Sequence, residues 1–153
     1  MTIRYTINVL KFTFFTIILL ILSLPAYSEL SVEEIIKGRK ALFSKNYSTA
    51  KRVQALASKE EFDKAKTLMI EMSQNYKTLI EYFPDNTKEG FKTEALPSIW
   101  ENKKEFNDLM KKSSDDMIKL TSLIEDSEDI RATLTQMMWG NCKACHSKFR
   151  APH

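Results

Sequence analysis

Apolar and polar residues alternate with helical periodicity along four stretches of this chain. In the first stretch, from residue 32 to about residue 57, apolar residues recur at intervals of three, four and seven, which places them on one face of a helix. Ser31 and Glu34 form a capping-box pattern at its start. Helix propensity drops at residues 46–48, where we expect local strain. The pattern predicts one long amphipathic helix.

Two further stretches open with the same capping pattern. Ser58 and Ser98 are each followed three residues later by a glutamate, the arrangement in which both side chains bond backbone N–H groups of the first turn. Apolar stripes then cover residues 62–83 and residues 99–124. We therefore predict a second and a third helix, each capped by its serine.

The remaining pattern completes a bundle. An acidic segment at residues 125–129 supplies N-caps and first-turn carboxylates for a fourth apolar stripe, residues 130–149, which includes Gly140. Residues 84–97 contain two prolines and a glycine and form the one long connection. Four amphipathic helices joined mostly by short turns predict an all-α, antiparallel up-down-up-down four-helix bundle.

The first 28 residues differ from the rest of the chain. Two basic residues precede an apolar run at residues 12–24, and the small residues Ala26 and Ser28 occupy the positions that a signal peptidase reads. We interpret residues 1–28 as a cleaved signal peptide and residues 29–153 as the mature domain. An uncleaved membrane anchor is the alternative, although the run is shorter than the roughly 20 residues that span a bilayer.

Composition adds limits to this picture. The 153 residues are 43% apolar and 28% charged, which is typical of one globular domain. Without the two basic residues of the signal segment, the formal net charge falls from +3 to +1. A nearly neutral chain gives no indication of nucleic-acid binding. We expect a periplasmic protein without stable membrane insertion once the signal is removed.

The candidate chemistry lies near the C-terminus. Both cysteines of the chain, Cys142 and Cys145, are followed directly by His146, the attachment signature of a c-type haem. On a helix, residues i, i+3 and i+4 share one face, so both thiols can reach one porphyrin edge and the imidazole can bind its iron. Thiol oxidoreductases also use a CxxC motif, but there it follows a strand, and this sequence predicts none.

A haem motif on the last helix of a predicted bundle resembles the cytochrome c′ family, the class II cytochromes c. The strongest part is residues 142–150, Cys-Lys-Ala-Cys-His-Ser-Lys-Phe-Arg. Residues 96–100, Leu-Pro-Ser-Ile-Trp, resemble the head of the family's third helix, and residues 38–43, Gly-Arg-Lys-Ala-Leu-Phe, a segment of its first helix. The resemblance covers essentially the whole mature chain and implies the same bundle fold.

The resemblance implies roles for residues of the last and first helices. Cys142 and Cys145 carry one covalent haem c, and His146 is the axial metal ligand. Arg39 pairs with a haem propionate, and Phe43 covers the opposite face of the iron. From the residues alone, Arg39 also fits a side chain that extends from the stripe edge to solvent, and Phe43 an ordinary core residue.

Two further residues gain roles in the same way. Trp100 borders the haem pocket. Its position just after the start of the third helix also fits a hydrophobic-staple residue or an ordinary core residue. Arg150 lies on the side of the haem at which His146 binds the iron, and it influences His146 electrostatically. Low-spin family members bind iron through a methionine of the first helix, whereas this chain has no methionine between Ser31 and Leu68. We therefore expect a five-coordinate, high-spin iron that binds NO and CO.

These expectations lead to three functional hypotheses. The first is one-electron transfer with redox partner proteins, and the second is a module that binds nitric oxide and buffers or senses it. A CxxC thiol oxidoreductase is a remote third. No acid, base or nucleophile constellation accompanies the haem motif, so we do not expect an enzyme. The resemblance also implies that two copies can pair as a homodimer through their first two helices.

Overall fold

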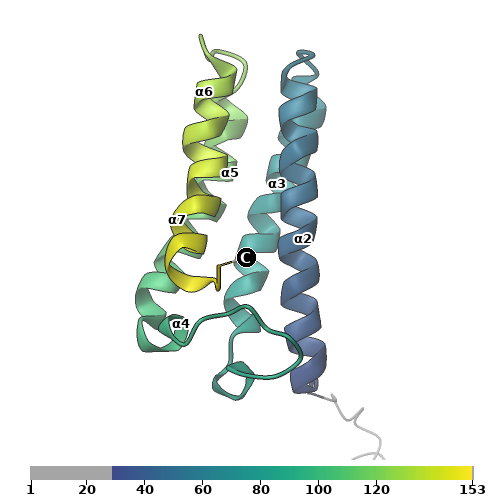
Figure 1. Ribbon diagram of the computed structural model, residues 1–153. Coiled ribbons are helices and arrows are strands. Elements are labelled where there is room, and N and C mark those ends of the chain that lie inside the picture. Colours follow the sequence, from purple (N-terminus) through teal and green to yellow (C-terminus); the bar gives the residue numbers. More distant parts are fainter. Residues whose placement is uncertain (1–28, 153) are drawn as a thin grey trace, which may run out of the picture.

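The computed structural model describes residues 29–152 and is an all-α four-helix bundle with up-down-up-down topology (Figure 1). The predicted signal segment lies outside the described residues. Within residues 29–152, every helix is too short or too polar to cross a bilayer. The elements are, in chain order, α2 (Val32–Ala57), α3 (Phe62–Leu79), the 3-10 turns η1 (Ile80–Tyr82) and η2 (Asp85–Thr87), α4 (Ser98–Glu101), α5 (Lys103–Leu123), α6 (Ile130–Leu134), the π-helical turn η3 (Thr135–Trp139) and α7 (Gly140–Phe149).

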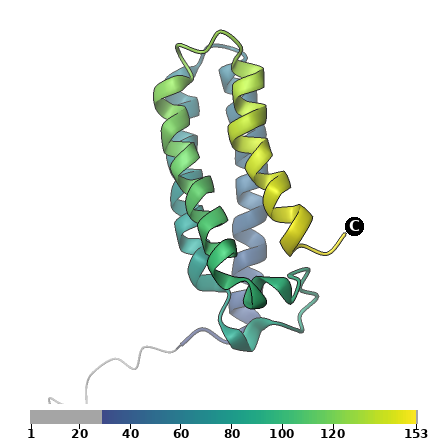
Figure 2. The ribbon, with the colours of Figure 1, turned by 90° about the vertical axis from the view of Figure 1, so that its left-hand side faces the viewer.

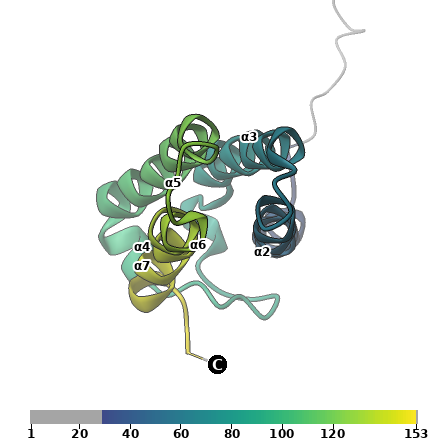
Figure 3. The same ribbon diagram turned by 90° about the horizontal axis from the view of Figure 1, so that it is seen from above.

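The helices do not pack equally closely around the bundle. Seen from above, α2, α3, α5 and the final helix α6–η3–α7 occupy four corners (Figure 3). α3 packs against both α2 and α5, and α5 against the final helix, whereas α2 contacts that helix mainly at α6. Figure 2 shows the final helix descending beside α5, with the connection 84–97 below it. α2 and α7 make few close contacts with each other.

The apolar stripes predicted from the sequence meet in the core. Burial of a large apolar side chain stabilises the folded state by about 1.5–3 kcal/mol, so these contacts hold the bundle together. Methionine, which adapts its shape to irregular gaps, is unusually frequent among them. The buried side chains include Ile36, Val53, Leu79, Phe106, Leu120, Leu134, and the methionines 69, 72, 110, 117 and 138.

The helix starts show which capping predictions were right. At α2 the capping box is confirmed, because Ser31 Oγ accepts from Glu34 N and Glu34 Oε2 accepts from Ser31 N at 2.8 Å. Asp129 likewise caps α6 by accepting from Ala132 N at 2.9 Å. In both cases the capping side chain lies directly before the first residue of its helix, as the sequence predicts.

The two other predicted caps were wrong. Ser58 is the C-cap of α2, and its hydroxyl donates back to Gln54 O at 2.8 Å, so it is already engaged with the preceding helix. Ser98 donates across the molecule to Lys148 O at 2.9 Å, and the N-cap of α4 is Pro97. In both cases the serine hydroxyl donates to a backbone carbonyl instead of accepting from an N–H group of the following helix.

The predicted weak point of the first helix was also wrong. α2 continues through residues 46–48, where Asn46 and Thr49 are buried against the rest of the bundle. The irregularity lies instead in the final helix, as the π-helical turn η3 directly before α7. Such turns are common at functional sites because the extra residue re-aims the side chains that follow.

Candidate functional site

A cavity of about 780 Å³ opens between α2 and α7. This volume falls within the roughly 300–1,000 Å³ typical of ligand pockets. α2, α3, α5, α7 and the connection 84–97 all contribute to its wall. α2 and α7, which both contribute lining residues, stand apart along the side of the bundle (Figure 1).

The residues of the haem motif lie together on this cavity. Cys142, Cys145 and His146 all line it, as expected for positions i, i+3 and i+4 of one helix. Cys145 is 7% exposed, Cys142 is half-buried, and His146 is exposed. One turn of α7 therefore presents two sulfur atoms and an imidazole to a single hollow.

Both thiols are held in their neutral form. Burial raises the pKa of Cys145 to about 12, and the neighbouring Cys142 adds to the rise. Burial also raises the pKa of Cys142, opposed by the hydrogen bond with Tyr76. Redox-active CxxC pairs depend on a lowered thiol pKa, so this environment does not favour thiol–disulfide exchange.

Arg39 of α2 lines the cavity and is buried, with 2% of its surface exposed. Its guanidinium donates to Tyr82 O at 3.2 Å and to Thr87 Oγ1 at 3.0 Å, as well as to Thr87 O at 2.9 Å and Thr93 Oγ1 at 2.6 Å. The ring of Phe83 lies 4.7 Å from the guanidinium carbon. Arg39 therefore does not extend to solvent.

The charge of Arg39 is not matched by a carboxylate. Its hydrogen-bond partners are neutral oxygens, and it forms no ion pair within residues 29–152. Burial accordingly lowers the pKa of Arg39 to about 10, which still leaves it protonated near neutral pH. A buried cation on a cavity wall favours an anionic group in that cavity.

Phe43 lines the cavity from α2, four residues after Arg39. Its ring meets Phe83 edge-on at 6.4 Å, and Phe83 in turn meets Phe106 at 4.7 Å. Phe149 of α7 packs on Phe106 at 5.4 Å. These rings give the cavity an aromatic wall, to which Met110 of α5 adds the only thioether among the lining residues.

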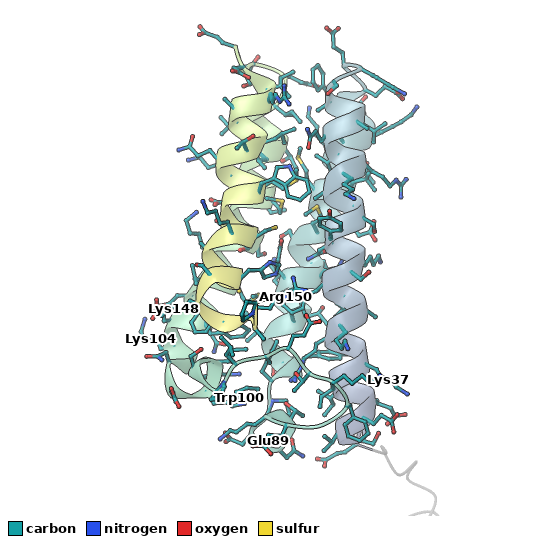
Figure 4. All side chains as sticks on the ribbon, in the orientation of Figure 1. Lys37, Glu89, Trp100, Lys104, Lys148 and Arg150 are labelled. Atoms are coloured by element: carbon teal, nitrogen blue, oxygen red, sulfur yellow. The ribbon has the colours of Figure 1, made fainter. Side chains whose placement is uncertain are left out.

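Trp100 does not reach the cavity wall. Its indole N–H donates to Phe83 O at 3.1 Å and Pro84 O at 3.2 Å, and its ring packs on Phe83 at 6.0 Å. Figure 4 shows it low in the molecule, where it belongs to α4. The two carbonyls fix the orientation of the indole. Trp100 therefore packs on Phe83 and Arg39, which line the cavity, without lining it itself.

Arg150 lines the cavity at the end of the final helix (Figure 4). It forms an ion pair with Glu94 of the connection 84–97, with Nε–Oε2 at 2.9 Å and NH2–Oε2 at 2.8 Å. Glu94 lines the cavity as well. The pair joins two edges of the cavity mouth, four residues beyond His146.

Several wall residues were missed in the sequence. Tyr76 lies among the apolar residues of the second stripe, and Asn46 at the expected strain in the first, so neither stood out. Tyr47 and Trp139 meet edge-on at 5.9 Å across the gap between α2 and η3. Tyr47 lies four residues after Phe43, and Trp139 lies four residues before Lys143, so each shares a helix face with a residue that lines the cavity. This spacing points to the cavity only after the cavity has been located.

These observations fit a covalently attached haem. The donor set is two thiols and one imidazole on a single helical turn, which matches thioether attachment and axial ligation. The cavity wall also carries flat aromatic side chains and a buried guanidinium, suited to a ring that carries carboxylates. All of these groups come from residues within the described part of the chain.

Comparisons with known proteins agree with this site. A family model described as Cytochrome C' matches residues 34–150. A relative from Rhodopseudomonas palustris, named cytochrome c', is 33% identical over 121 residues, which cover 77% of this chain and 82% of the relative.

Solved structures give the same result. Cytochrome c' from Rhodopseudomonas palustris is 31% identical with a TM-score of 0.61, covering 77% of this chain and 96% of its own. Cytochrome c' from Thermochromatium tepidum has a TM-score of 0.69 at 19% identity, covering 82% of this chain and 100% of its own. At 19% identity, the similarity to the Thermochromatium tepidum structure shows a shared fold alone.

Proposed function

This chain belongs to the cytochrome c′ family, whose members carry covalent haem c, and on that basis we propose that it is an exported one-electron carrier whose iron also binds NO and CO. The observation that supports this most strongly is the convergence of Cys142, Cys145 and His146 on one cavity. Phe43 lines the same cavity from the other helix at its mouth. The proposal includes no catalytic turnover.

The residues of α7 would hold the cofactor. Cys142 and Cys145 each supply a sulfur for a thioether, and His146 supplies a ring nitrogen to the iron. When bound, the haem supplies an iron that changes oxidation state by one electron and can take a further small ligand. Cys145 is buried, and the rings of Phe83 and Phe106 give the cavity an apolar wall.

Two arginines would set the charge around the cofactor. Arg39 is the buried cation without a carboxylate partner, so we assign it to a haem propionate. Arg150 carries its charge four residues after His146 and is held by Glu94, so it is placed to act on the proximal side. Both roles follow from positive charge close to the cavity.

The position across from His146 would remain open. We place Phe43 there, since α2 contributes this ring and has no methionine. A hydrocarbon side chain cannot coordinate iron and donates no hydrogen bond to bound dioxygen, so NO and CO are favoured over it. Five-coordinate, high-spin iron is the expected resting state.

The same feature supports a second candidate function. A site that keeps one coordination position open suits a module that binds nitric oxide and buffers or senses it, rather than a dedicated electron carrier. If the ferrous protein binds neither NO nor CO, this candidate fails while electron transfer stands. The thiol oxidoreductase is disfavoured by the raised pKa of both thiols.

The attachment residues can be tested by substitution. Cys142→Ser and Cys145→Ser, expressed together with haem-attachment machinery, should each lose the thioether at the changed position. Mass spectrometry of denatured protein measures the retained haem, and Ser147→Ala on the same helix is the control. Full covalent retention in both cysteine variants would contradict the proposed attachment.

The optical spectrum tests the open coordination position. The ferrous wild type should show a broad high-spin spectrum, and Phe43→Met should convert it to a split low-spin α/β pattern because a thioether now reaches the iron. Phe91→Met makes the same change at an exposed loop position and should leave the spectrum unchanged. A high-spin Phe43→Met protein would show that Phe43 does not lie opposite His146.

A further inference from the structure

The Tyr76 hydroxyl lies beside the sulfur of Cys142. Tyr76 belongs to α3, is 5% exposed and lines the cavity. Its oxygen is 3.9 Å from Cys142 Sγ, within the range of a hydrogen bond that involves sulfur. Cys145, one turn further along α7, has no hydrogen bond to its sulfur within residues 29–152. The two cysteines of the motif are therefore in different environments.

Two buried asparagines, Asn46 and Asn75, are linked to each other close to Tyr76. Asn75 Nδ2 donates to Asn46 Oδ1 at 2.8 Å, which fixes the orientation of the Asn46 amide. Asn46 is 3% exposed and lines the cavity, and its Nδ2 is a buried donor without a hydrogen-bond partner in the described chain. The same amide group is close enough to lower the pKa of Tyr76. Buried donors are seldom left unpaired, so a nearby acceptor is expected.

We propose that Tyr76 is a positioning residue for haem attachment: its O–H donates to the Cys142 sulfur, and Asn46 Nδ2 donates to the Tyr76 oxygen. A chain of hydrogen bonds then runs from Asn75 through Asn46 and Tyr76 to Cys142. This inference rests on the proposed thioether at Cys142. A thioether sulfur has no hydrogen, so after attachment only the tyrosine can donate.

The role of Tyr76 is orientation rather than proton transfer. Attachment adds the thiol across a vinyl group: sulfur bonds one carbon, the thiol hydrogen ends on the other, and the π bond breaks with no net gain or loss of electrons. Burial, together with Cys142, raises the pKa of Tyr76, so its hydroxyl keeps its hydrogen throughout. A hydrogen bond from a buried, fixed hydroxyl limits the directions in which the Cys142 side chain can point.

The test is Tyr76→Phe in the full chain, expressed with haem-attachment machinery. We expect more chains with haem linked only through Cys145, with the ratio of double to single attachment lowered about fivefold, the factor for one hydrogen bond. Peptide mass mapping locates the linkage. The alkaline pyridine spectrum reports it independently, because a retained vinyl group moves the α band to longer wavelength.

Tyr82→Phe is the matched control, since Tyr82 is not among the residues that line the cavity and its hydroxyl forms no hydrogen bond within residues 29–152. It should attach haem as the wild type does. A folded Tyr76→Phe protein with the wild-type ratio would overturn the inference, as would equal losses at Cys142 and Cys145. Absence of haem from Cys142 in the wild type would instead refute the proposed function.

A second variant covers the case in which Tyr76→Phe does not fold. Asn46→Asp keeps the oxygen that accepts from Asn75 but replaces the donor facing Tyr76 by an acceptor. That acceptor competes with the Cys142 sulfur for the tyrosine hydrogen, so single attachment through Cys145 should again increase. An unchanged attachment ratio in Asn46→Asp would count against the hydrogen-bond chain.

Discussion

Arg39 illustrates how much a single residue can organise. Its two terminal nitrogens reach acceptors in three separate segments, at Tyr82, Thr87 and Thr93. A planar guanidinium can make these bonds in several directions at once, whereas a lysine ammonium offers one compact group. Arg39 therefore fixes the connection 84–97 to α2 and at the same time brings positive charge to the cavity.

We predict that Arg39→Lys lowers the free energy of unfolding of the haem-loaded protein by about 2–3 kcal/mol, since several bonds from a buried charged group are lost. Denaturant unfolding followed by circular dichroism measures this. Arg52→Lys makes the same change at an exposed position of α2 and should alter stability by less than about 0.5 kcal/mol. Equal effects of the two variants would contradict a special role for Arg39.

At the scale of elements, one polar cluster holds α5 against α7. Asn141, directly before Cys142, donates to Asp116 Oδ2 at 2.8 Å, and Lys112 also pairs with that carboxylate. Burial acts to raise the pKa of Asp116, but the hydrogen bonds from Lys112 and Asn141 outweigh it and hold the pKa below its usual value. The ionised carboxylate thus stabilises the contact between the two helices.

This cluster predicts a pH dependence. A carboxyl group with a lowered pKa in the folded state contributes stability at neutral pH, and that contribution is lost as the pH falls below the usual value of 3.8 toward the folded pKa. Asp116→Asn should therefore lower the thermal midpoint at pH 7 and reduce its acid dependence.

Asp115→Asn is the control for this prediction. Asp115 pairs with Lys111 at the same spacing, but on the exposed face of α5. Exposed pairs contribute little, so the variant should change the midpoint at pH 7 much less. Matching melting curves for Asp115→Asn and Asp116→Asn across acid pH would show that the contact with Asn141 carries no pH-dependent stability.

At the scale of the whole molecule, the connection 84–97 and the chain end close the lower side of the cavity together. Ala151 N donates to Glu94 O at 2.8 Å and Leu96 N to Phe149 O at 3.0 Å, forming an isolated bridge. The ion pair between Glu94 and Arg150 reinforces it. Segments far apart in the sequence thereby share one edge of the site.

We predict that Glu94→Gln loosens this edge without unfolding the bundle. The ion pair is partly exposed, so the free energy of unfolding should fall by less than about 1 kcal/mol. Hydrogen exchange of peptides covering residues 84–97 and the chain end should nevertheless become faster, because local opening needs less free energy. Glu89→Gln, at an exposed position of the same connection, should leave exchange unchanged.

The local pattern of the sequence was enough for the bundle and for the haem motif. Helical periodicity, the Ser31 cap and the i, i+3, i+4 spacing of Cys142, Cys145 and His146 all act over a few residues, so neighbours in the chain reveal them. The caps expected at Ser58 and Ser98 were wrong for two different reasons. Ser58 already serves the helix before it, and Ser98 bonds a carbonyl 50 residues away.

Only the tertiary structure decided what surrounds the motif. It brought Tyr76 to Cys142 across 66 residues and buried Arg39 among acceptors 43 to 54 residues away, and it placed Trp100 behind the cavity wall. These contacts join segments far apart in the sequence, and their geometry depends on how those segments pack against one another. Periodicity along one helix tells which face is buried, but the spacing between helices is set by packing of the whole bundle.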